Sequence, residues 1–314
     1  GTSTSVSKIK HYKNNGINAY LFDNLSGPMI DNDALNKLYN ASHVLNTIPP
    51  DQENGEDYVL TCHGNDITQA VIKGSTKWIG YISSTGIYGD CKGDWVNENS
   101  PINPENRKTL ARSKADNAWW TLHTRNSLPI HIFRCAGIYG PNRSILDILK
   151  KSNGDFKACG ADDTTIISRI HIKDLVNVLI ASMILPSNGL KVNVADDLPA
   201  TRFDALLYGS RLLGYPLQSP TYSESSSRGG SKRIDNSVMK VLLKAAGLNE
   251  LSFPDYRSGI KSIYTQEKNE TENASNINRN KNNPFDIINR INKIENDILE
   301  LKQTIQSMNK IVEL

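Results

Sequence analysis

Short apolar runs alternate with amphipathic stretches along the first half of the chain. The apolar runs are rich in β-branched and aromatic residues and end at turn residues, as buried strands do; they span residues 17–22, 42–48, 77–83 and 130–135. Between them lie stretches with helical spacing at about residues 5–14, 56–72 and 106–125. This alternation predicts an α/β fold in which a parallel sheet is covered by helices on both faces.

The composition of the 314 residues is that of an ordinary globular protein, with a formal net charge of +3. So small a charge indicates neither a nucleic-acid partner nor a polybasic membrane patch. No apolar run reaches the roughly 18 residues that a membrane helix needs. No His, Cys or Asp cluster has metal-ligand spacing, so we expect no metal site. The cysteines have no CxxC spacing and are expected to be reduced thiols; they are Cys62, Cys91, Cys135 and Cys159.

The pattern changes past residue 140. From there to residue 264, short strands and amphipathic helices predict the remaining elements of the first domain and a smaller lobe that closes over the strand ends. Residues 265–283 are polar, rich in Asn and nearly free of apolar residues, so we interpret them as a flexible linker. The sequence therefore predicts four parts, at residues 1–140, 141–264, 265–283 and 284–314.

Residues 284–314 have the spacing of a coiled coil. Apolar residues repeat at strict 3,4 spacing, with β-branched residues at every a position; they are Ile291, Ile294, Ile298, Leu301, Ile305, Met308 and Val312. This pattern favours a parallel two-stranded coiled coil in which Asp297 of one helix faces Lys302 of the other. We therefore expect a homodimer. The alternative is one amphipathic helix that folds back on its own domain.

Several motifs occur at the ends of the predicted strands. The principal ones are SSTGIYGD at 83–90, FRCAGIYGP at 133–141 and RIHIKDL at 169–175, accompanied by NTIPPD (46–51), DWVNENSPINP (94–104), NVADDLP (193–199) and SKRIDN (231–236). With these motifs in this order, the chain resembles the NAD(P)-dependent epimerase/dehydratase superfamily, and in particular the atypical extended short-chain dehydrogenase/reductases. The resemblance runs from Gly1 to about Ile263. It implies a Rossmann-type doubly wound parallel sheet with a small C-terminal substrate lobe.

The resemblance also implies roles for individual residues. In that superfamily a serine or threonine four residues before the Tyr of the Tyr-Gly pair hydrogen-bonds the substrate, and Ser84 matches it. The alternative is that the hydroxyls of residues 83–85 only satisfy turn backbone. By the same resemblance, the nicotinamide cofactor would contact Thr4, Thr47, Ile48, Pro49, Ser83, Lys114, Ala136, Gly137 and Ile138. The substrate would contact Thr85, Tyr88, Tyr139, Arg169 and His171, with a purely structural role as the alternative for His171.

The predicted helix at 106–125 departs from the family pattern. The family carries a Tyr and, four residues later, a Lys on this helix. In one register Lys108 takes the tyrosine position and Arg112 the lysine position; in the other, Lys114 is the lysine and Leu110 stands in place of the tyrosine. Neither register supplies a tyrosine, although a cation here can still bind a phosphate or carboxylate. The catalytic candidates are therefore Ser84, Lys108 and Arg112.

A second departure concerns the start of the fold. A dinucleotide-binding fold begins with a strand, a G-x-G-x-x-G turn and a helix whose N-terminus receives the pyrophosphate. This glycine pattern occurs nowhere in the sequence. In the register that fits the family better, residues 1–5 end the second strand, and Thr4 stands where NADP-preferring relatives carry an Arg. Because a βαβ unit takes roughly 30 residues or more, we expect at least that many before Gly1, and binding of NAD or NADP depends on them.

Two functional hypotheses follow. The first is an NAD(P)-dependent oxidoreductase or epimerase for a small substrate, with nucleotide-linked and phosphorylated compounds as candidates. The second is a catalytically inactive protein that senses the cofactor or serves as a scaffold through its coiled coil. The missing tyrosine favours the second, whereas the retained strand-end motifs favour the first. Cytoplasm is the default compartment, with an organelle such as a plastid as the alternative if a transit peptide precedes Gly1.

Overall fold

The computed structural model describes residues 1–22, 31–157, 159, 164–185, 187–219, 230–248 and 250–279, the last six by their backbone alone. The chain falls into two units, Gly1–Ser262 and Ile263–Leu314. The predicted coiled coil at 284–314, and the dimer expected from it, lie outside the described residues. No helix in the described ranges is long and apolar enough to cross a membrane.

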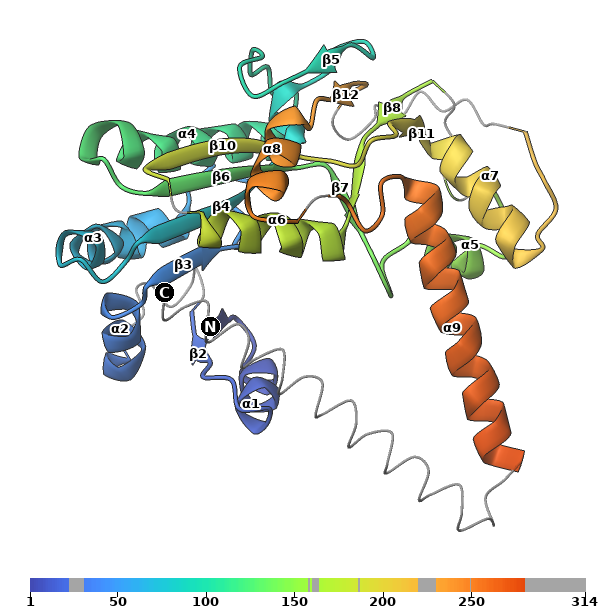
Figure 1. Ribbon diagram of the computed structural model, residues 1–314, viewed down its shortest axis with the longest axis horizontal. Helices are drawn as coiled ribbons and strands as arrows, with labels where there is room; N and C mark the ends of the chain where they lie inside the picture. Colours follow the sequence, from blue (N-terminus) through green and yellow to red (C-terminus); the bar gives the residue numbers. More distant parts are fainter. Residues whose placement is uncertain are drawn as a thin grey trace. The chain divides into compact units, whose positions relative to one another are not determined.

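A parallel four-stranded sheet forms the centre of the first unit, in the order β10-β6-β4-β3 (Figure 1). Its strands are β3 (His43–Asn46), β4 (Trp78–Ser84), β6 (Ile130–Cys135) and β10 (Gly189–Val194). The register of β4 and β6 pairs Ile79 with Ile130 and Ser84 with Cys135. The two strands therefore end side by side, and the predicted parallel sheet is confirmed.

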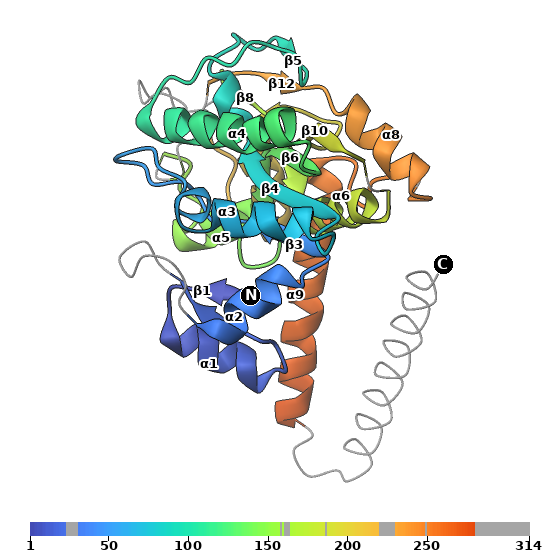
Figure 2. The ribbon, with the colours of Figure 1, turned by 90° about the vertical axis from the view of Figure 1, so that its left-hand side faces the viewer.

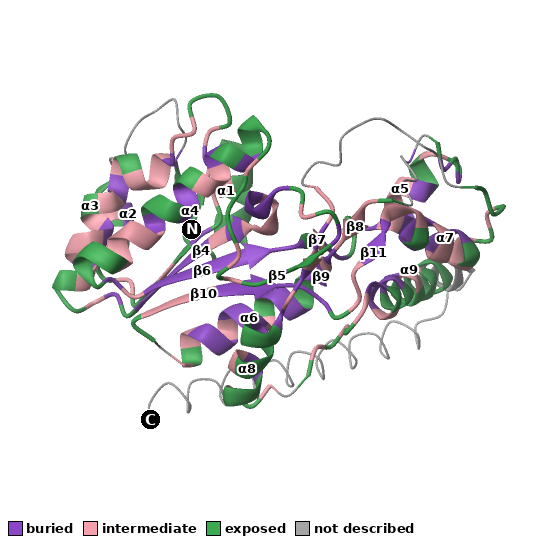
Figure 3. Cartoon of the chain, turned by 90° about the horizontal axis from the view of Figure 1, so that it is seen from above, coloured by how far each residue is buried: buried purple, intermediate pink, exposed green. Residues whose placement is uncertain are grey.

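Helices cover both faces of this sheet, as Figure 2 and Figure 3 show. One face is covered by α3 (Tyr58–Ile72) and α4 (Arg107–Asn126), over a core of Ile67, Ile79, Tyr81, Ala115, Trp119, Ile130 and Ile132. The other is covered by α6 (Ile172–Ile184) and α8 (Ser237–Ala245), over a core that includes Trp78, Phe133, Val178, Val192, Val194 and Met239. Because neighbouring residues of a strand face opposite ways, strands buried on both faces read as continuous apolar runs.

A separate pair of short strands precedes this sheet. Strand β1 (Thr2–Ser3) pairs in parallel with β2 (Tyr20–Leu21), with α1 (Val6–Asn14) between them. Helix α2 (Asn32–Tyr39) then leads to β3. Within the described residues neither β1 nor β2 is hydrogen-bonded to β3, so the parallel strands form two pieces. The register with residues 1–5 in the second strand corresponds to this arrangement.

Shorter elements lie beyond the carboxyl ends of the long strands. They are the 3-10 helix η1 (Thr85–Tyr88), β5 (Trp95–Val96), β7 (Gly137–Tyr139), α5 (Ile145–Lys151), β8 (Ile166–Ile167), β9 (Arg169–His171), β11 (Ala200–Thr201), α7 (Arg202–Leu213), β12 (Arg233–Ile234) and α9 (Tyr256–Arg279). Strand pairs β7–β9, β8–β11 and β5–β12 connect them. Helices α5 and α7 enclose a small core of Leu149, Phe156, Cys159 and Leu206, which stabilises the second lobe.

The expectation of a flexible linker is wrong for residues 265–279, because α9 continues to Arg279. Several residues in this stretch are polar but form helices well. Pairs four residues apart add local support: Lys268 lies 3.9 Å from Glu272, and Gln266 donates to Glu270 at 3.0 Å. A segment with few apolar residues does not form a helix with a buried face. It can still form an exposed helix that polar pairs on its own surface stabilise.

Gly80 of β4 lies against the indole ring of Trp78, and a Cβ at this position would collide with the ring carbons. Trp78 is fully buried and donates from Nε1 to Ser182 Oγ at 2.8 Å, so the ring is held in place. We expect Gly80→Ala to lower the free energy of unfolding in urea by about 1–3 kcal/mol. The control is Gly64→Ala in α3, where the new Cβ meets only Leu60 at 3.9 Å and stability should hold or rise. Equal stability of Gly80→Ala and the parent would contradict this.

His131 of β6 is fully buried, with Nε2 at 3.1 Å from the Ser187 carbonyl oxygen. Burial lowers the pKa of His131 to about 4. This pKa lies below the unfolded value of about 6.5. Burial of the neutral His131 therefore contributes fully to stability above about pH 6.5, and the contribution is lost as the pH falls toward 4. We expect a loss of about 3 kcal/mol over this interval, measured by urea unfolding at several pH values. His131→Phe should lack this loss; the same pH dependence in both proteins would refute the assignment.

Candidate functional site

The carboxyl end of β4 presents Ser84 beside the end of β6. Ser84 is half-buried, and its Oγ accepts a hydrogen bond from the Gly86 backbone N–H at 3.1 Å, which starts η1. The next hydroxyl, of Thr85, donates to the Cys135 carbonyl oxygen at 3.4 Å. Since Ser84 Oγ acts as an acceptor toward the turn, its own hydrogen is free to donate to a ligand oxygen. Ser84 therefore caps the turn and still keeps a donor.

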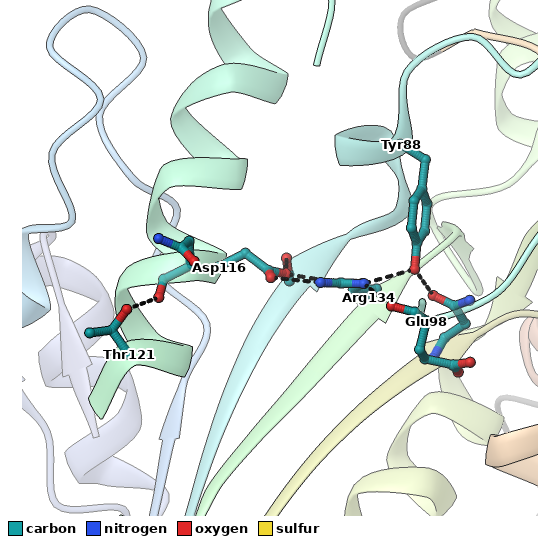
Figure 4. A network of polar contacts seen from close by, with 8 residues as sticks. Tyr88, Glu98, Asp116, Thr121 and Arg134 are labelled. Carbon is teal, nitrogen blue, oxygen red and sulfur yellow. Dashed lines mark hydrogen bonds and ion pairs between the residues drawn. The ribbon is translucent and has the colours of Figure 1, made fainter. Parts of the chain in front are cut away.

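A buried ion pair lies beneath this strand end (Figure 4). Arg134 of β6 donates from Nη2 to Asp116 Oδ1 at 3.0 Å and from Nε to Oδ2 at 3.2 Å. Both side chains are almost completely inaccessible, at 1% and 2% exposure. Ser83 Oγ donates to Asp116 Oδ2 at 2.6 Å. Strands β4 and β6 and helix α4 thus meet at one carboxylate.

The same guanidinium continues the network toward β10. Arg134 Nη1 donates to Tyr88 OH and to the Glu98 carbonyl oxygen, both at 3.0 Å. Tyr88 OH donates in turn to Asn193 Oδ1 at 2.8 Å. The hydroxyls of Ser83 and Tyr88, predicted to contact cofactor and substrate, are therefore engaged in the buried network. Because both residues are buried, their hydroxyls are not accessible to a ligand. Their hydrogen bonds instead stabilise the strand end inside the protein.

Arg112 of α4 is held by the end of β4. Its Nη1 donates to Tyr81 OH at 2.9 Å and to the Ile82 carbonyl oxygen at 2.8 Å. Lys108 and Lys114 are exposed on the same helix, as is Leu110. Tyr81 is fully buried, and burial raises the pKa of its phenol. Among the described residues, this helix thus presents a fixed cation and no accessible phenol.

The second lobe contains a cavity of about 870 Å³. Four of the predicted site residues lie together in its lining: Gly137, Ile138, Tyr139 and Arg169. Four further cations line it: Arg143 before α5, Lys150 and Lys151 in its last turn, and Arg202 at the start of α7. The sequence motifs located the wall formed by β7 but missed these four cations, which belong to none of the motifs.

Arg169 and His171 have structural contacts. Arg169 donates to the carbonyl oxygens of Ile167, Ala200 and Thr201 at 3.0, 2.9 and 3.0 Å. His171 is buried; its Nδ1 accepts from the backbone N–H of Lys173 at 3.2 Å at the start of α6, and its ring packs on Phe253. Burial lowers the pKa of His171. These contacts favour the structural role for His171, and Arg169 chiefly joins β8, β9 and β11.

A second cavity, of about 460 Å³, lies beside β3. Thr47 and Ile48 line it together with Thr2 and Tyr20, from the β1–β2 pair. Pro49 and Thr4 follow the same strands, and both are exposed. Ala136 is instead buried in a small cluster around Ile87. The predicted cofactor residues are thus divided between this cavity, the second lobe and the α4 surface.

Two buried carboxyls had no role in the sequence-based prediction. Asp116 belongs to none of the motifs, although an Arg within the apolar run at 130–135 is a signal that a buried partner charge is needed. Asp196, in the NVADDLP motif, is buried too, and burial raises its pKa to about 8. In the described ranges, no group of three or more His, Cys, Asp or Glu side chains is placed to hold a metal ion.

Comparison with known proteins identifies the fold. No family model matches the chain. Protein YeeZ of Escherichia coli (strain K12) is 25% identical over 239 residues, which cover 76% of this chain and 82% of YeeZ. The structure of a functionally unknown conserved protein from Silicibacter pomeroyi DSS has 29% identity, 85% and 89% coverage and a TM-score of 0.66. UDP-glucuronic acid 4-epimerase from Bacillus cereus, in complex with NAD, has 18% identity, 84% and 85% coverage and a TM-score of 0.62.

The chain has the fold of the NAD-dependent epimerases and dehydratases. The predicted resemblance is thereby confirmed at the level of the fold. Within this fold, Ser84 stands at the carboxyl end of β4, and α4 carries Lys108, Arg112 and Lys114 but no tyrosine.

The buried ion pair generates a prediction about stability. Asp116→Ala leaves the guanidinium of Arg134 buried without its carboxylate, so we expect a loss of about 3–5 kcal/mol in the free energy of unfolding. The double variant Asp116→Leu/Arg134→Met removes both charges and should be more stable than Asp116→Ala, as measured by urea unfolding. Ser83→Ala should lose about 1 kcal/mol. A double variant less stable than Asp116→Ala would show that the pair is not the source of the penalty.

Proposed function

We propose that the protein binds NAD or NADP and acts on a small anionic substrate as an oxidoreductase or epimerase of the extended short-chain dehydrogenase/reductase type. The observation that carries the proposal is the cavity beside β3. Its lining combines residues of the β1–β2 pair with β3 and with Thr47 and Ile48, which follow the carboxyl end of β3. Ligands of open α/β sheets bind outside the carboxyl ends of the strands.

The residues of this cavity suit the adenosine side of a dinucleotide. Thr2 and Thr47 offer hydroxyls, while Ile48 and Phe22 offer apolar surface for a planar base. Similar structures carry NAD, including the epimerase from Bacillus cereus. A bound nicotinamide would supply a hydride donor or acceptor. The family's glycine-rich turn is not among the 314 residues, so cofactor binding is the first property to test.

Ser84 and the second lobe support the substrate part of the proposal. The free hydrogen of Ser84 is positioned to donate to a carbonyl or hydroxyl oxygen of the substrate at the end of β4. Gly137, two residues beyond the partner of Ser84 in β6, opens into the large cavity. The cations Arg143 and Lys151 favour an anionic substrate, for which phosphorylated and nucleotide-linked compounds are candidates.

One observation favours a second candidate function, a cofactor sensor without turnover. Arg112 donates a hydrogen bond to the Ile82 carbonyl oxygen, and an arginine side chain stays protonated in proteins. No accessible phenol accompanies it on α4 within the described residues. A protein of this kind would bind the cofactor and transmit its presence without oxidising a substrate.

The decisive experiment is a titration with NADH and NADPH, followed by energy transfer from the tryptophans, and a turnover assay with a panel of carbonyl compounds. We expect at least one nucleotide to bind. If a substrate turns over, Ser84→Ala should lower kcat by about 100-fold and leave nucleotide affinity unchanged. Ser113→Ala on α4 is the matched control and should change neither.

The outcomes separate the two functions. Binding without turnover of any compound favours the sensor. Failure of both nucleotides to bind contradicts both cofactor-based functions.

A further inference from the structure

The cavity of the second lobe has a mostly apolar wall. At about 870 Å³ it lies within the usual size of small-molecule sites. Its aliphatic side chains come from β7, α5, β8, α7 and the first turns of α9, elements that gather in the second lobe in Figure 3; they are Ile138, Ile145, Ile148, Ile167, Ala205 and Ile260. Apolar side chains supplied by five elements form a wall, not an isolated patch.

Most hydrogen-bonding groups of this wall are already engaged. The Ser144 hydroxyl donates to Asp147 at 2.8 Å and accepts from the Leu146 N–H at 3.1 Å. Tyr139 OH donates to the Asp255 carbonyl oxygen at 3.5 Å, and Arg169 contacts three carbonyl oxygens. A ligand with a hydroxyl on most carbons would leave many of them unpaired here, which is unfavourable. The wall therefore suits a hydrocarbon better than a sugar.

Two cations at the rim are not engaged. Arg143, just before α5, and Lys151, its last residue, are exposed, and neither side chain makes a hydrogen bond or ion pair within the described residues. The carboxylate of the lining, Asp147, is held by the N–H and hydroxyl of Ser144. The rim therefore carries two positively charged side chains that have no partner among the described residues, and they lie beside an apolar interior.

We propose that this cavity binds an amphipathic anion, with a hydrocarbon body against the isoleucines and a carboxylate or phosphate head beside Arg143 and Lys151. The apolar wall contributes affinity in proportion to the area that it covers, and the rim selects the charged head. The inference deepens the proposed function and rests on it for calling the ligand a substrate, because it names the class of molecule that the second lobe accepts.

The first test is calorimetric titration of the full chain with hexanoate, octanoate and decanoate. Affinity should rise about fourfold for each added methylene, and octanoate should bind more tightly than 1-octanol, which lacks the charge. UDP-glucose should bind more weakly than decanoate. Affinity that does not depend on chain length, or tighter binding of UDP-glucose than of decanoate, overturns the proposal.

Variants test the two parts of the cavity. Arg143→Ala/Lys151→Ala should lower decanoate affinity at least tenfold and leave 1-octanol unchanged. Lys10→Ala/Lys244→Ala, which removes the same charge from exposed positions of α1 and α8, should change neither. Ala205→Phe should weaken both ligands by filling the apolar interior, with circular dichroism showing that the fold is kept. Full decanoate affinity in the first double variant overturns the assigned rim.

NADH titration of the same proteins separates this inference from the proposed function. If alkanoates bind with an affinity that depends on chain length but NADH does not bind, the result supports the ligand class inferred for the cavity and contradicts the proposed function. If NADH binds but alkanoates do not, the result supports the proposed function and contradicts the inference.

Discussion

The buried pair of Arg134 and Asp116 is the contact on which the site depends. A charge taken out of water is unfavourable unless its donors and acceptors are all met, and here neighbouring elements supply the partners: Ser83 from β4, Tyr88 from η1 and the loop that carries Glu98. Tyr88 extends the network to Asn193 of β10. Three strands are thereby fixed near their carboxyl ends and joined to the middle of α4. Ser84 is the next residue after Ser83, so its position follows from the same network.

Much of the fold was predictable because its signals are local. The apolar runs at 77–83 and 130–135 became β4 and β6, and residues 106–125 became α4. The extent of α9 was not, because apolar content measures burial and not helix formation. In the site, spacing placed Ser84 at a strand end, but it said nothing of whether a hydroxyl faces solvent or an ion pair. Ser83 and Tyr88 are distinguished from Ser84 by their hydrogen bonds to Asp116 and Arg134, which lie far along the chain.

The large cavity shows a similar limit. Tyr139 and Arg169 were found through motifs, yet their polar groups join elements of the lobe to one another. Two charged groups left for a ligand, Arg143 and Lys151, belong to no motif. Ligand class in this lobe depends on which polar groups remain unengaged after folding, and that requires the full set of partners. A motif identifies the wall, whereas the contacts determine what the wall can bind.

Proton balance distinguishes the two candidate functions most directly. Oxidation of an alcohol transfers a hydride and also releases a proton, which a group with a pKa near the working pH accepts most efficiently. An unactivated serine hydroxyl is a poor acceptor, and the guanidinium of Arg112 cannot give up its own proton. Lys108 and Lys114 are exposed on α4. The described strand end can therefore orient and polarise a substrate oxygen without a residue ready to take its proton. Turnover at this strand end therefore needs a proton acceptor other than Ser84 and Arg112, and a basic group on the substrate is one candidate.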